Sequence, residues 1–308
     1  MLAVFAVIAA AMLFGTTGTA QALGPEGTTP LAVGAMRLMI GGTALAAVGF
    51  VLARRRTRTG GHVNPPLTRR ALLLMALTGV CLAAYQPLFF LGTARNGVAV
   101  GTVIALGSAP VLAGLLEWML TRRLPSATWM AATALATLGV VLLGVGGGAG
   151  TTGGADAVGL LGSIGAGASF AIFANAQRRL MDDGWDPFTV AGAMGAGSAI
   201  VGALALPFVD LSWLADPRGL AMALWLGIAT IAVAYTLFTW GLERLTAATA
   251  ATLTLAEPLT AGVLGIVVLD ERLSALAIAG LAVLGAGLVL LAWGSRAARD
   301  PRPFPVEA

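Results

Sequence analysis

The sequence predicts an all-α integral membrane protein of ten transmembrane helices, arranged as two inverted five-helix repeats with both termini in the cytoplasm. The composition, the spacing of the apolar runs and a set of matches between the two halves of the chain lead to this prediction. Of the 308 residues, 58% are hydrophobic and only 10% are charged. A soluble domain carries about 25% charged residues. The chain therefore has too little polar surface to face water, and we expect it to lie in a lipid bilayer.

Ten apolar runs follow one another, separated by short polar or glycine-rich segments. Each has about 20 residues, which as a helix cross about 30 Å of hydrocarbon. The first ends in Ala20-Gln21-Ala22, which looks like a signal-peptide cleavage site. It has no positively charged segment before it and exceeds the usual length of a signal peptide's apolar region, so we predict a transmembrane helix. The predicted spans are 2–20, 30–52, 71–91, 98–120, 127–147, 157–178, 188–208, 219–240, 247–269 and 275–293.

The arginines predict the orientation of these spans. With the N-terminus in the cytoplasm, Arg37 lies within a span and only Arg95, Arg218 and Arg272 lie in outer loops. All other arginines then fall in cytoplasmic segments, which is the bias that membrane proteins show. We therefore expect both termini, and the basic loop around His62, to be cytoplasmic.

Short matches between the two halves of the chain occur in the same order and indicate an internal repeat. They pair Ala20-Gln21 with Ala176-Gln177, Gly34–Arg37 with Gly192–Gly195, Ala84-Tyr85 with Ala234-Tyr235, Ala109-Pro110 with Glu257-Pro258, and Ser126 with Ser274. Because five spans are an odd number, the second half enters the membrane in the opposite direction. Inverted repeats are typical of alternating-access transporters, whose site lies near the midplane between the halves. We expect a first repeat over 1–147, an outer linker over 148–156, a second repeat over 157–293 and a cytoplasmic basic tail over 294–308.

Three segments carry a resemblance to a known family: FGTTGTAQ (14–21), PLAVGAMRLMIGG (30–42) and EPLTAGVLGIVVLDERLS (257–274). Together with the ten spans in two repeats, they resemble the EamA family of the drug/metabolite transporter superfamily, over about 1–147 and 157–293. The first repeat departs from the pattern, with Arg122-Arg123-Leu124 where the second has Glu271-Arg272-Leu273. The resemblance implies the export of small metabolites, often amino acids, without ATP hydrolysis.

Glu257 and Pro258 stand side by side near the middle of the ninth predicted span. A carboxylate at this depth is costly unless it is paired or protonated. Pro258 has no N–H to donate to the carbonyl of Thr254, so we expect that oxygen to be free to face a substrate. Pro110, beside Ser108, is equally central in the fourth span, and we expect the two kinks to face each other. They indicate a cavity or gate; alternatively, they only shape the packing of the helices.

Arg37 is the other intramembrane charge, and Glu26 or Glu257 are its expected partners unless it reaches to the outer interface. Tyr85 and Tyr235, the only tyrosines, occupy equivalent positions in the two repeats. We expect them to be walls of one cavity, with Gln86 and Trp240 close by, rather than members of an interfacial belt. A further polar wall is predicted from Thr16, Thr17, Gln21 and Asn175, although threonine also bonds back to its own helix.

Other charged residues are expected to be structural or solvated. Glu117 precedes Arg122 by five residues, which favours an interfacial ion pair, and Asp182, Asp183 and Asp186 are expected to face solvent. One histidine and one cysteine make a metal site improbable, and we expect no cofactor. The chain contains no lysine, so it has no P-loop for ATP hydrolysis.

These observations predict a secondary transporter that moves a small amphipathic metabolite, such as an amino acid, across the cytoplasmic membrane, in the export direction. The expected partners are the lipid bilayer and a small-molecule substrate, with no nucleic acid, and Glu257 is positioned for proton coupling. Uptake would use the same architecture. The alternatives are a structural or sensor protein without transport, or an intramembrane enzyme, for which no HExxH or GxSxG motif is present.

Overall fold

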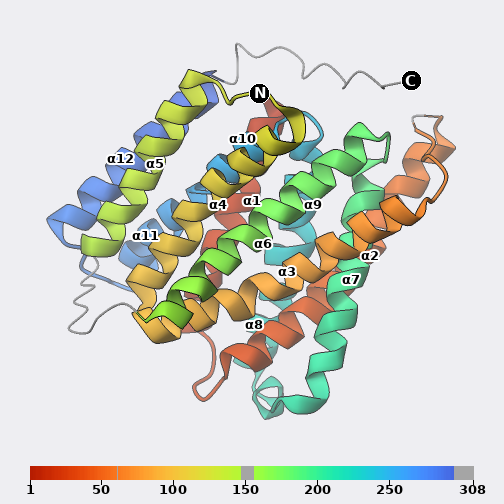
Figure 1. Ribbon diagram of the computed structural model, residues 1–308. Coiled ribbons are helices and arrows are strands. Elements are labelled where there is room, and N and C mark those ends of the chain that lie inside the picture. Colours follow the sequence, from red (N-terminus) through yellow and green to blue (C-terminus); the bar gives the residue numbers. More distant parts are fainter. Residues whose placement is uncertain (61, 147–155, 295–308) are drawn as a thin grey trace.

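The computed structural model describes residues 1–60, 62–146 and 156–294, and all regular secondary structure in these ranges is helical (Figure 1). By length and composition, ten helices of the described ranges can cross a membrane, which confirms the ten predicted spans. The predicted linker, apart from Asp156, and the basic tail beyond Gly294 lie outside the described residues.

The first half of the chain forms five long helices. They are α1 (Leu2–Ala22), α2 (Pro30–Arg58), α3 (Arg69–Asn96), α4 (Val98–Thr121) and α5 (Ala127–Gly146). Thr29 and Thr68 are the N-cap residues immediately before α2 and α3, and each hydroxyl accepts a hydrogen bond from the backbone N–H three residues on. Such caps satisfy N–H groups that the first turn of a helix leaves without a partner.

The second half repeats this order with two irregular spans. Its elements are α6 (Ala157–Asp182), α7 (Pro187–Ala205), the 3-10 turns η1 (Leu206–Phe208) and η2 (Ser212–Ala215), α8 (Pro217–Leu224), the π-helix η3 (Trp225–Val233), α9 (Ala234–Leu242), α10 (Ala247–Leu253), α11 (Ala256–Val268) and α12 (Ala275–Gly294). The eighth span consists of α8, η3 and α9, and the ninth consists of α10 and α11.

The break between α10 and α11 corrects one expectation. The carbonyl oxygen of Thr254 is not free, because it accepts a hydrogen bond of 2.9 Å from the N–H of Glu257. Pro258 cannot bond to that carbonyl, so the preceding residue takes its place in a tighter turn. In the first repeat, α4 instead continues through Pro110 without interruption. The two prolines therefore affect their helices differently.

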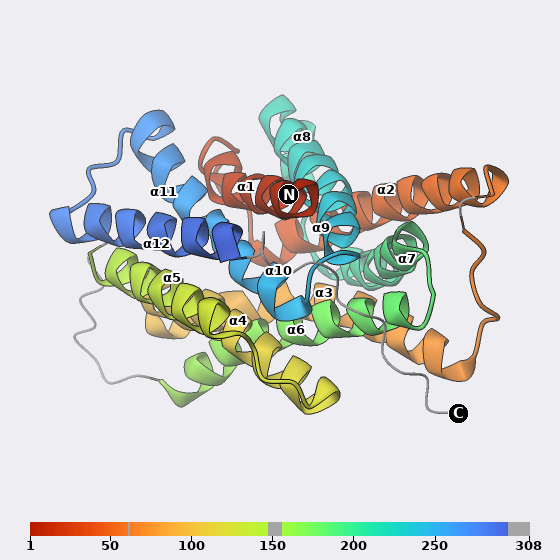
Figure 2. The same cartoon turned by 90° about the horizontal axis from the view of Figure 1, so that it is seen from above.

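Helices of the two repeats pack against each other rather than only within each half. The equivalent helices α5 and α12 lie side by side, as do α2 and α7, while α3 packs on α6 and α1 packs on α9 and η3 (Figures 1 and 2). A Cβ atom added at Gly139 of α5 would lie 2.7 Å from the carbonyl oxygen of Gly280 on α12. Small residues thus allow the close backbone approach on which membrane helices depend.

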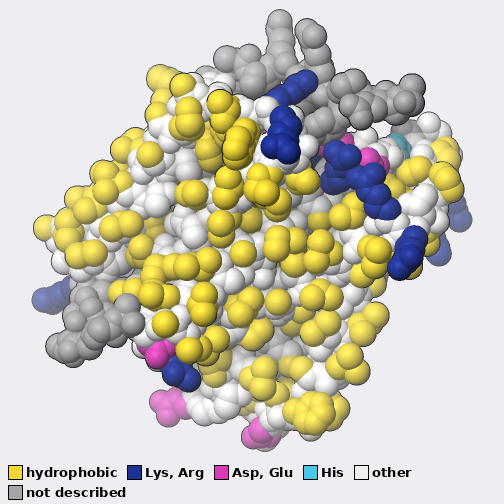
Figure 3. Space-filling view, viewed as in Figure 1, with side chains coloured by type: hydrophobic (Ala, Val, Ile, Leu, Met, Phe, Trp, Pro, Cys, Tyr) yellow, Lys and Arg dark blue, Asp and Glu magenta, His cyan; other side chains and the backbone are white. Residues whose placement is uncertain are grey.

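The two ends of the bundle differ in charge. The arginine-rich end contains Met1 and residues 59–60, 62–68, 122–126, 183–186 and 243–246. The arginine-poor end contains the connections 23–29, 206–216 and 269–274. In the face that Figure 3 shows, arginines gather mainly toward the end where the N-terminus lies, and apolar side chains cover the surface between the ends. Large apolar side chains exposed on the flanks, such as Phe5 and Ile200, suit contact with lipid.

Two aspartates at the arginine-rich end are held by arginines, Asp186 by one of the other repeat and Asp182 by one of its own helix, which corrects the expectation that they are solvated. Asp186 is only 2% exposed; its carboxylate accepts a hydrogen bond of 2.9 Å from Arg56 and caps α7. Asp182 pairs with Arg178 at 2.8 Å.

Glu117 also differs from expectation. It makes no ion pair with Arg122 in the described residues; its Oε2 instead accepts a hydrogen bond of 2.8 Å from the backbone N–H of Ala248. A helix of the first repeat therefore caps α10 of the second. The first turn of α10 has N–H groups without intrahelical partners, and they attract the nearest carboxylate.

Candidate functional site

A cavity of about 350 Å³ lies between the two repeats. Side chains from α1, α2, α3 and α4 of the first repeat and from α6, η3, α9 and α11 of the second line it. The structure brings the following predicted site residues to its wall: Thr17, Gln21, Arg37, Tyr85, Gln86, Tyr235, Thr254 and Glu257. The cavity thus contains both intramembrane charges and both tyrosines.

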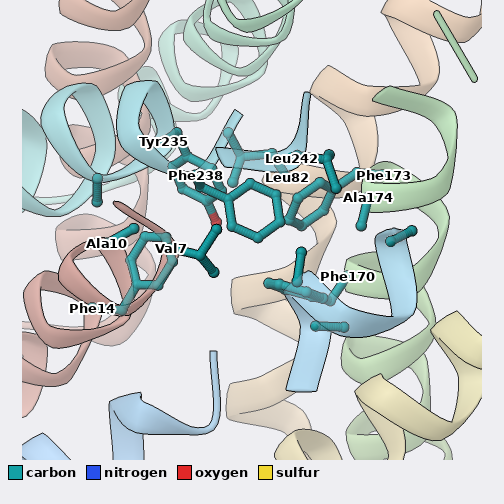
Figure 4. Close-up of a cluster of buried hydrophobic side chains, with 14 of the residues drawn as sticks. Val7, Ala10, Phe14, Leu82, Phe170, Phe173, Ala174, Tyr235, Phe238 and Leu242 are labelled. Carbon is teal, nitrogen blue, oxygen red and sulfur yellow. The ribbon is translucent and has the colours of Figure 1, made fainter. Parts of the chain in front are cut away.

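A cluster of aromatic rings closes the cavity toward the arginine-rich end. We call Phe170, Phe173, Tyr235 and Phe238 the aromatic plug (Figure 4). Its ring centroids lie 4.6 Å apart for Phe170 and Phe173 and 6.0 Å apart for Phe173 and Phe238, and all four side chains are buried. Val7 and Leu242, which lie nearer to the arginine-rich ends of their helices, pack into the same cluster. Toward the arginine-poor end, the lining residues Gly18 and Ala261 are exposed. The cavity is therefore closed toward the arginine-rich end, and its exposed lining residues lie toward the arginine-poor end.

Arg37 points into the protein and is held by neutral partners. Its Nε donates a hydrogen bond of 3.1 Å to the hydroxyl of Thr230 in the π-helix η3, and one terminal nitrogen donates to Oε1 of Gln86 at 3.5 Å. No carboxylate of the described residues lies within ion-pair distance of Arg37, so the expected direct pairing with Glu26 or Glu257 is not formed. The charge of Glu257 nevertheless attracts Arg37 at longer range. Gly195, the repeat counterpart of Arg37, instead packs against the backbone of Gly42. A guanidinium has five N–H donors, which leaves some of them for a ligand.

Glu257 stands in the first turn of α11, where the positive end of the helix dipole favours a carboxylate. In the part of the chain that the structure describes, no hydrogen bond or ion pair joins its carboxylate to another residue. Its backbone is held closely by α1: a Cβ atom added at Gly15 would lie 2.6 Å from the carbonyl oxygen of Glu257. The position of the carboxylate is thus set by backbone packing, and its oxygens are left for a proton or a ligand.

The two tyrosines face the cavity from equivalent spans, α3 and α9. The ring of Tyr85 stacks on that of Phe89, with centroids 6.1 Å apart, and meets Phe170 edge-on. The ring of Tyr235 lies 4.9 Å from that of Phe14. Tyr85 is half-buried, whereas Tyr235 is only 6% exposed. Tyr235 therefore belongs to both the cavity wall and the aromatic plug.

Several predicted site residues lie away from the cavity wall. Ser108 faces Gly167 on α6, Trp240 packs against the Arg244 guanidinium at 5.2 Å, Thr16 accepts a hydrogen bond from Trp225, Asn175 donates to the carbonyl of Ala113 on α4, and Pro110 and Pro258 are buried in their helices. Thr254 lines the cavity, but its hydroxyl donates to the carbonyl of Ala251. These residues position helices, which is the alternative that the sequence had left open for the prolines.

Residues that the sequence did not single out also form the wall. Phe14, Phe170 and Thr102 line the cavity, and Thr230 holds Arg37. Phe14 is the first residue of the segment 14–21, which carries part of the family resemblance, so the sequence did contain a signal for this residue. The other three stand in ordinary apolar runs, where nothing distinguishes a cavity-facing residue from a lipid-facing one. Within the described ranges, no group of three or more His, Cys, Asp and Glu residues is placed to hold a metal ion.

Comparisons with known proteins agree with this architecture. The model of the EamA-like transporter family matches residues 1–145 and again 157–293. The chain is 40% identical over 290 residues to an uncharacterized transporter of Bacillus subtilis (strain 168), YwfM, covering 94% of this chain and 93% of that one. It also resembles the crystal structure of a protein with a TM-score of 0.74 and 19% identity, over 96% of this chain and 98% of the other. At that identity, the likeness concerns the fold alone.

Proposed function

The chain belongs to the EamA-like transporter family, and we propose that it exports a small amphipathic metabolite, such as an amino acid, across the cytoplasmic membrane. Membership of the family makes it a membrane transporter of small solutes, with several helices crossing the bilayer. The substrate class, the direction, the membrane and the mechanism are the proposal.

The observation that carries the proposal is the pairing of opposite charges in one cavity with aromatic walls. Arg37 and Glu257 both line it, and neither makes a direct ion pair within the described residues. The remaining wall is mainly apolar, with the rings of Phe14, Phe89 and Phe170. A solute with charged groups and an apolar part matches both features. The volume is near the lower limit for small-molecule sites, about 300–1,000 Å³.

Alternating access follows from the inverted repeats. If the arginine-rich end faces the cytoplasm, as the arginine bias favours, this structure is an outward-facing state, closed inside by the aromatic plug. In such transporters, one repeat or helix bundle rocks against the other around a fixed site. We expect the inward-facing state to separate the plug and to close the opposite mouth near Gly18 and Ala261. Glu257, which has no partner in the described residues, would carry the proton that couples transport to the gradient.

Counterflow in proteoliposomes tests the proposed function. Liposomes preloaded with one unlabelled solute from a panel of amino acids, purines, sugars and cationic drugs are diluted into the labelled solute. We expect saturable uptake for at least one amphipathic solute, and its loss in Arg37→Gln. Arg244→Gln is the matched control, because Arg244 packs on Trp240 outside the cavity. If a normally melting protein shows no counterflow with any panel member, or if both variants behave alike, the proposed function is wrong.

A further inference from the structure

A second pocket, of about 480 Å³, lies on the flank of the protein between α2, α3 and α7. We call it the flank pocket. It lies in the arginine-poor half, because its wall includes Thr29 and Leu31 at the start of α2, Ala94 near the end of α3 and Ala205 at the end of α7. Leu31 is 55% exposed. In a protein that crosses a bilayer, this flank faces acyl chains.

The flank pocket and the central cavity share part of their walls. Leu38, Gln86 and Phe90 line both of them. At this point, a single layer of side chains separates the bilayer from the cavity that contains Arg37 and Glu257. The flank pocket is therefore continuous with the proposed site, which an isolated groove in a lipid-facing surface would not be.

The barrier between the two spaces is closed in this structure, since Leu38 and Gln86 are only 7% and 8% exposed, but the polar contact that holds it is long. The amide of Gln86 is tied to Arg37 by a contact of 3.5 Å, at the long limit for a hydrogen bond. Gly34 faces the same amide. A Cβ atom added at Gly34 would lie 3.5 Å from Gln86, which is an ordinary van der Waals contact. The ring of Phe90 is only partly buried. We expect these two side chains to open the barrier by changes of rotamer, which are fast compared with helix motions.

We propose that the flank pocket is a lateral opening that connects the central cavity with the bilayer, with Gln86 and Phe90 as its barrier. The inference rests on the transport function proposed above and adds a route to it. The solute would be amphipathic, with an apolar part that dissolves in the bilayer and an anionic group such as a carboxylate.

The chemistry of the walls supports this class of solute. Apart from Thr29 and Gln86, the residues of the flank pocket are apolar, so a charged group gains nothing there. Directly behind Gln86 stands Arg37, the cation that an anionic group would meet on passing the barrier. An apolar part can thus occupy the flank pocket while the head group occupies the cavity.

Thiol labelling tests the opening without any knowledge of the substrate. In a Cys81→Ala background, Thr102→Cys places a thiol in the central cavity, on a helix that does not line the flank pocket. The reagents are N-phenylmaleimide, which partitions into the bilayer, and 2-sulfonatoethyl methanethiosulfonate, which is charged and arrives through water. Gly34→Leu fills the flank pocket from its floor, and Val201→Trp fills it from its exposed rim without entering the core. Gly285→Leu on α12 is the matched control, because an added Cβ atom meets nothing there within 4 Å.

Relative to the control, both filling variants are expected to slow the labelling of the introduced thiol by N-phenylmaleimide about tenfold. This corresponds to an activation barrier raised by about 1.4 kcal/mol. The rate with the charged reagent is expected to stay unchanged. For each reagent, the labelling rate of a filling variant is divided by that of the control, so differences in reactivity between the two reagents cancel. An unchanged rate with N-phenylmaleimide in both variants, or equal slowing of both reagents, would overturn the lateral opening. Since labelling does not depend on transport, slowed labelling in a protein without counterflow would reject the proposed function and leave the opening standing.

Discussion

Replacing Glu257 with glutamine is expected to stop proton-driven accumulation of the solute without weakening the fold. The carboxylate has no hydrogen-bond or ion-pair partner in the described residues, so an uncharged side chain of the same shape removes no direct contact and loses only the longer-range attraction to Arg37. The variant loses the favourable position at the start of α11, which contributes about 0.3–1 kcal/mol. It also no longer needs to bury a charge, which offsets this loss. The free energy of unfolding should therefore change little.

Glu117→Gln is the matched control, because it makes the same change at a carboxylate in another membrane-spanning helix, α4. Oε2 of Glu117 accepts a hydrogen bond of 2.8 Å from the N–H of Ala248. A bond to a charged acceptor is about twice as strong as a neutral one, and a neutral one contributes about 1 kcal/mol. The control should therefore lose about 1 kcal/mol of stability. The two glutamates are predicted to respond in opposite ways, with coupling lost at Glu257 and stability lost at Glu117.

The assay compares two modes of transport in the same proteoliposomes. An imposed pH gradient drives accumulation, which requires a proton to bind and leave, whereas counterflow at equal pH requires no net proton movement. Glu257→Gln should abolish the first and retain the second, with an unchanged melting temperature. Normal gradient-driven accumulation in this variant would refute the coupling role, and a large drop in melting temperature would reveal a structural partner. The double variant with Arg37→Gln should lose less stability than the sum of the two single variants, because Arg37 and Glu257 attract each other electrostatically without forming an ion pair.

Three further predictions concern the wall, the arginine-rich end and the orientation. Tyr85→Ala and Tyr235→Ala should both reduce counterflow, but only the second should also cost about 3–5 kcal/mol of stability, because its ring is buried; equal melting of the two variants would contradict this difference. Asp186→Ala should lower the melting temperature through loss of the α7 cap, about 1 kcal/mol, and of a buried carboxylate's ion pair, and a melting temperature equal to that of the parent protein would speak against it. In a Cys81→Ala background, a cysteine in place of His62 should resist an impermeant reagent in intact cells, and rapid labelling there would reverse the predicted orientation.

The spans and the repeat could be predicted from the sequence because each depends on local composition. A run of about 20 apolar residues has no favourable place in water, wherever the rest of the chain lies. Short matches such as Ala84-Tyr85 with Ala234-Tyr235 needed only the order of residues. Both tyrosines line one cavity, as expected from their equivalence in the repeat.

The partners of the polar residues were decided only by the tertiary structure. Arg37 bonds to Thr230 and Gln86 rather than to a glutamate, and Glu117 caps α10 rather than pairing with Arg122. Each contact joins helices far apart in the chain, so it depends on how those helices are rotated and where they cross. In lipid, the apolar pattern does not record that rotation, because a core-facing and a lipid-facing side chain are equally apolar. The sequence therefore determined which residues lie in the membrane, and the packing of the two repeats determined which of them meet.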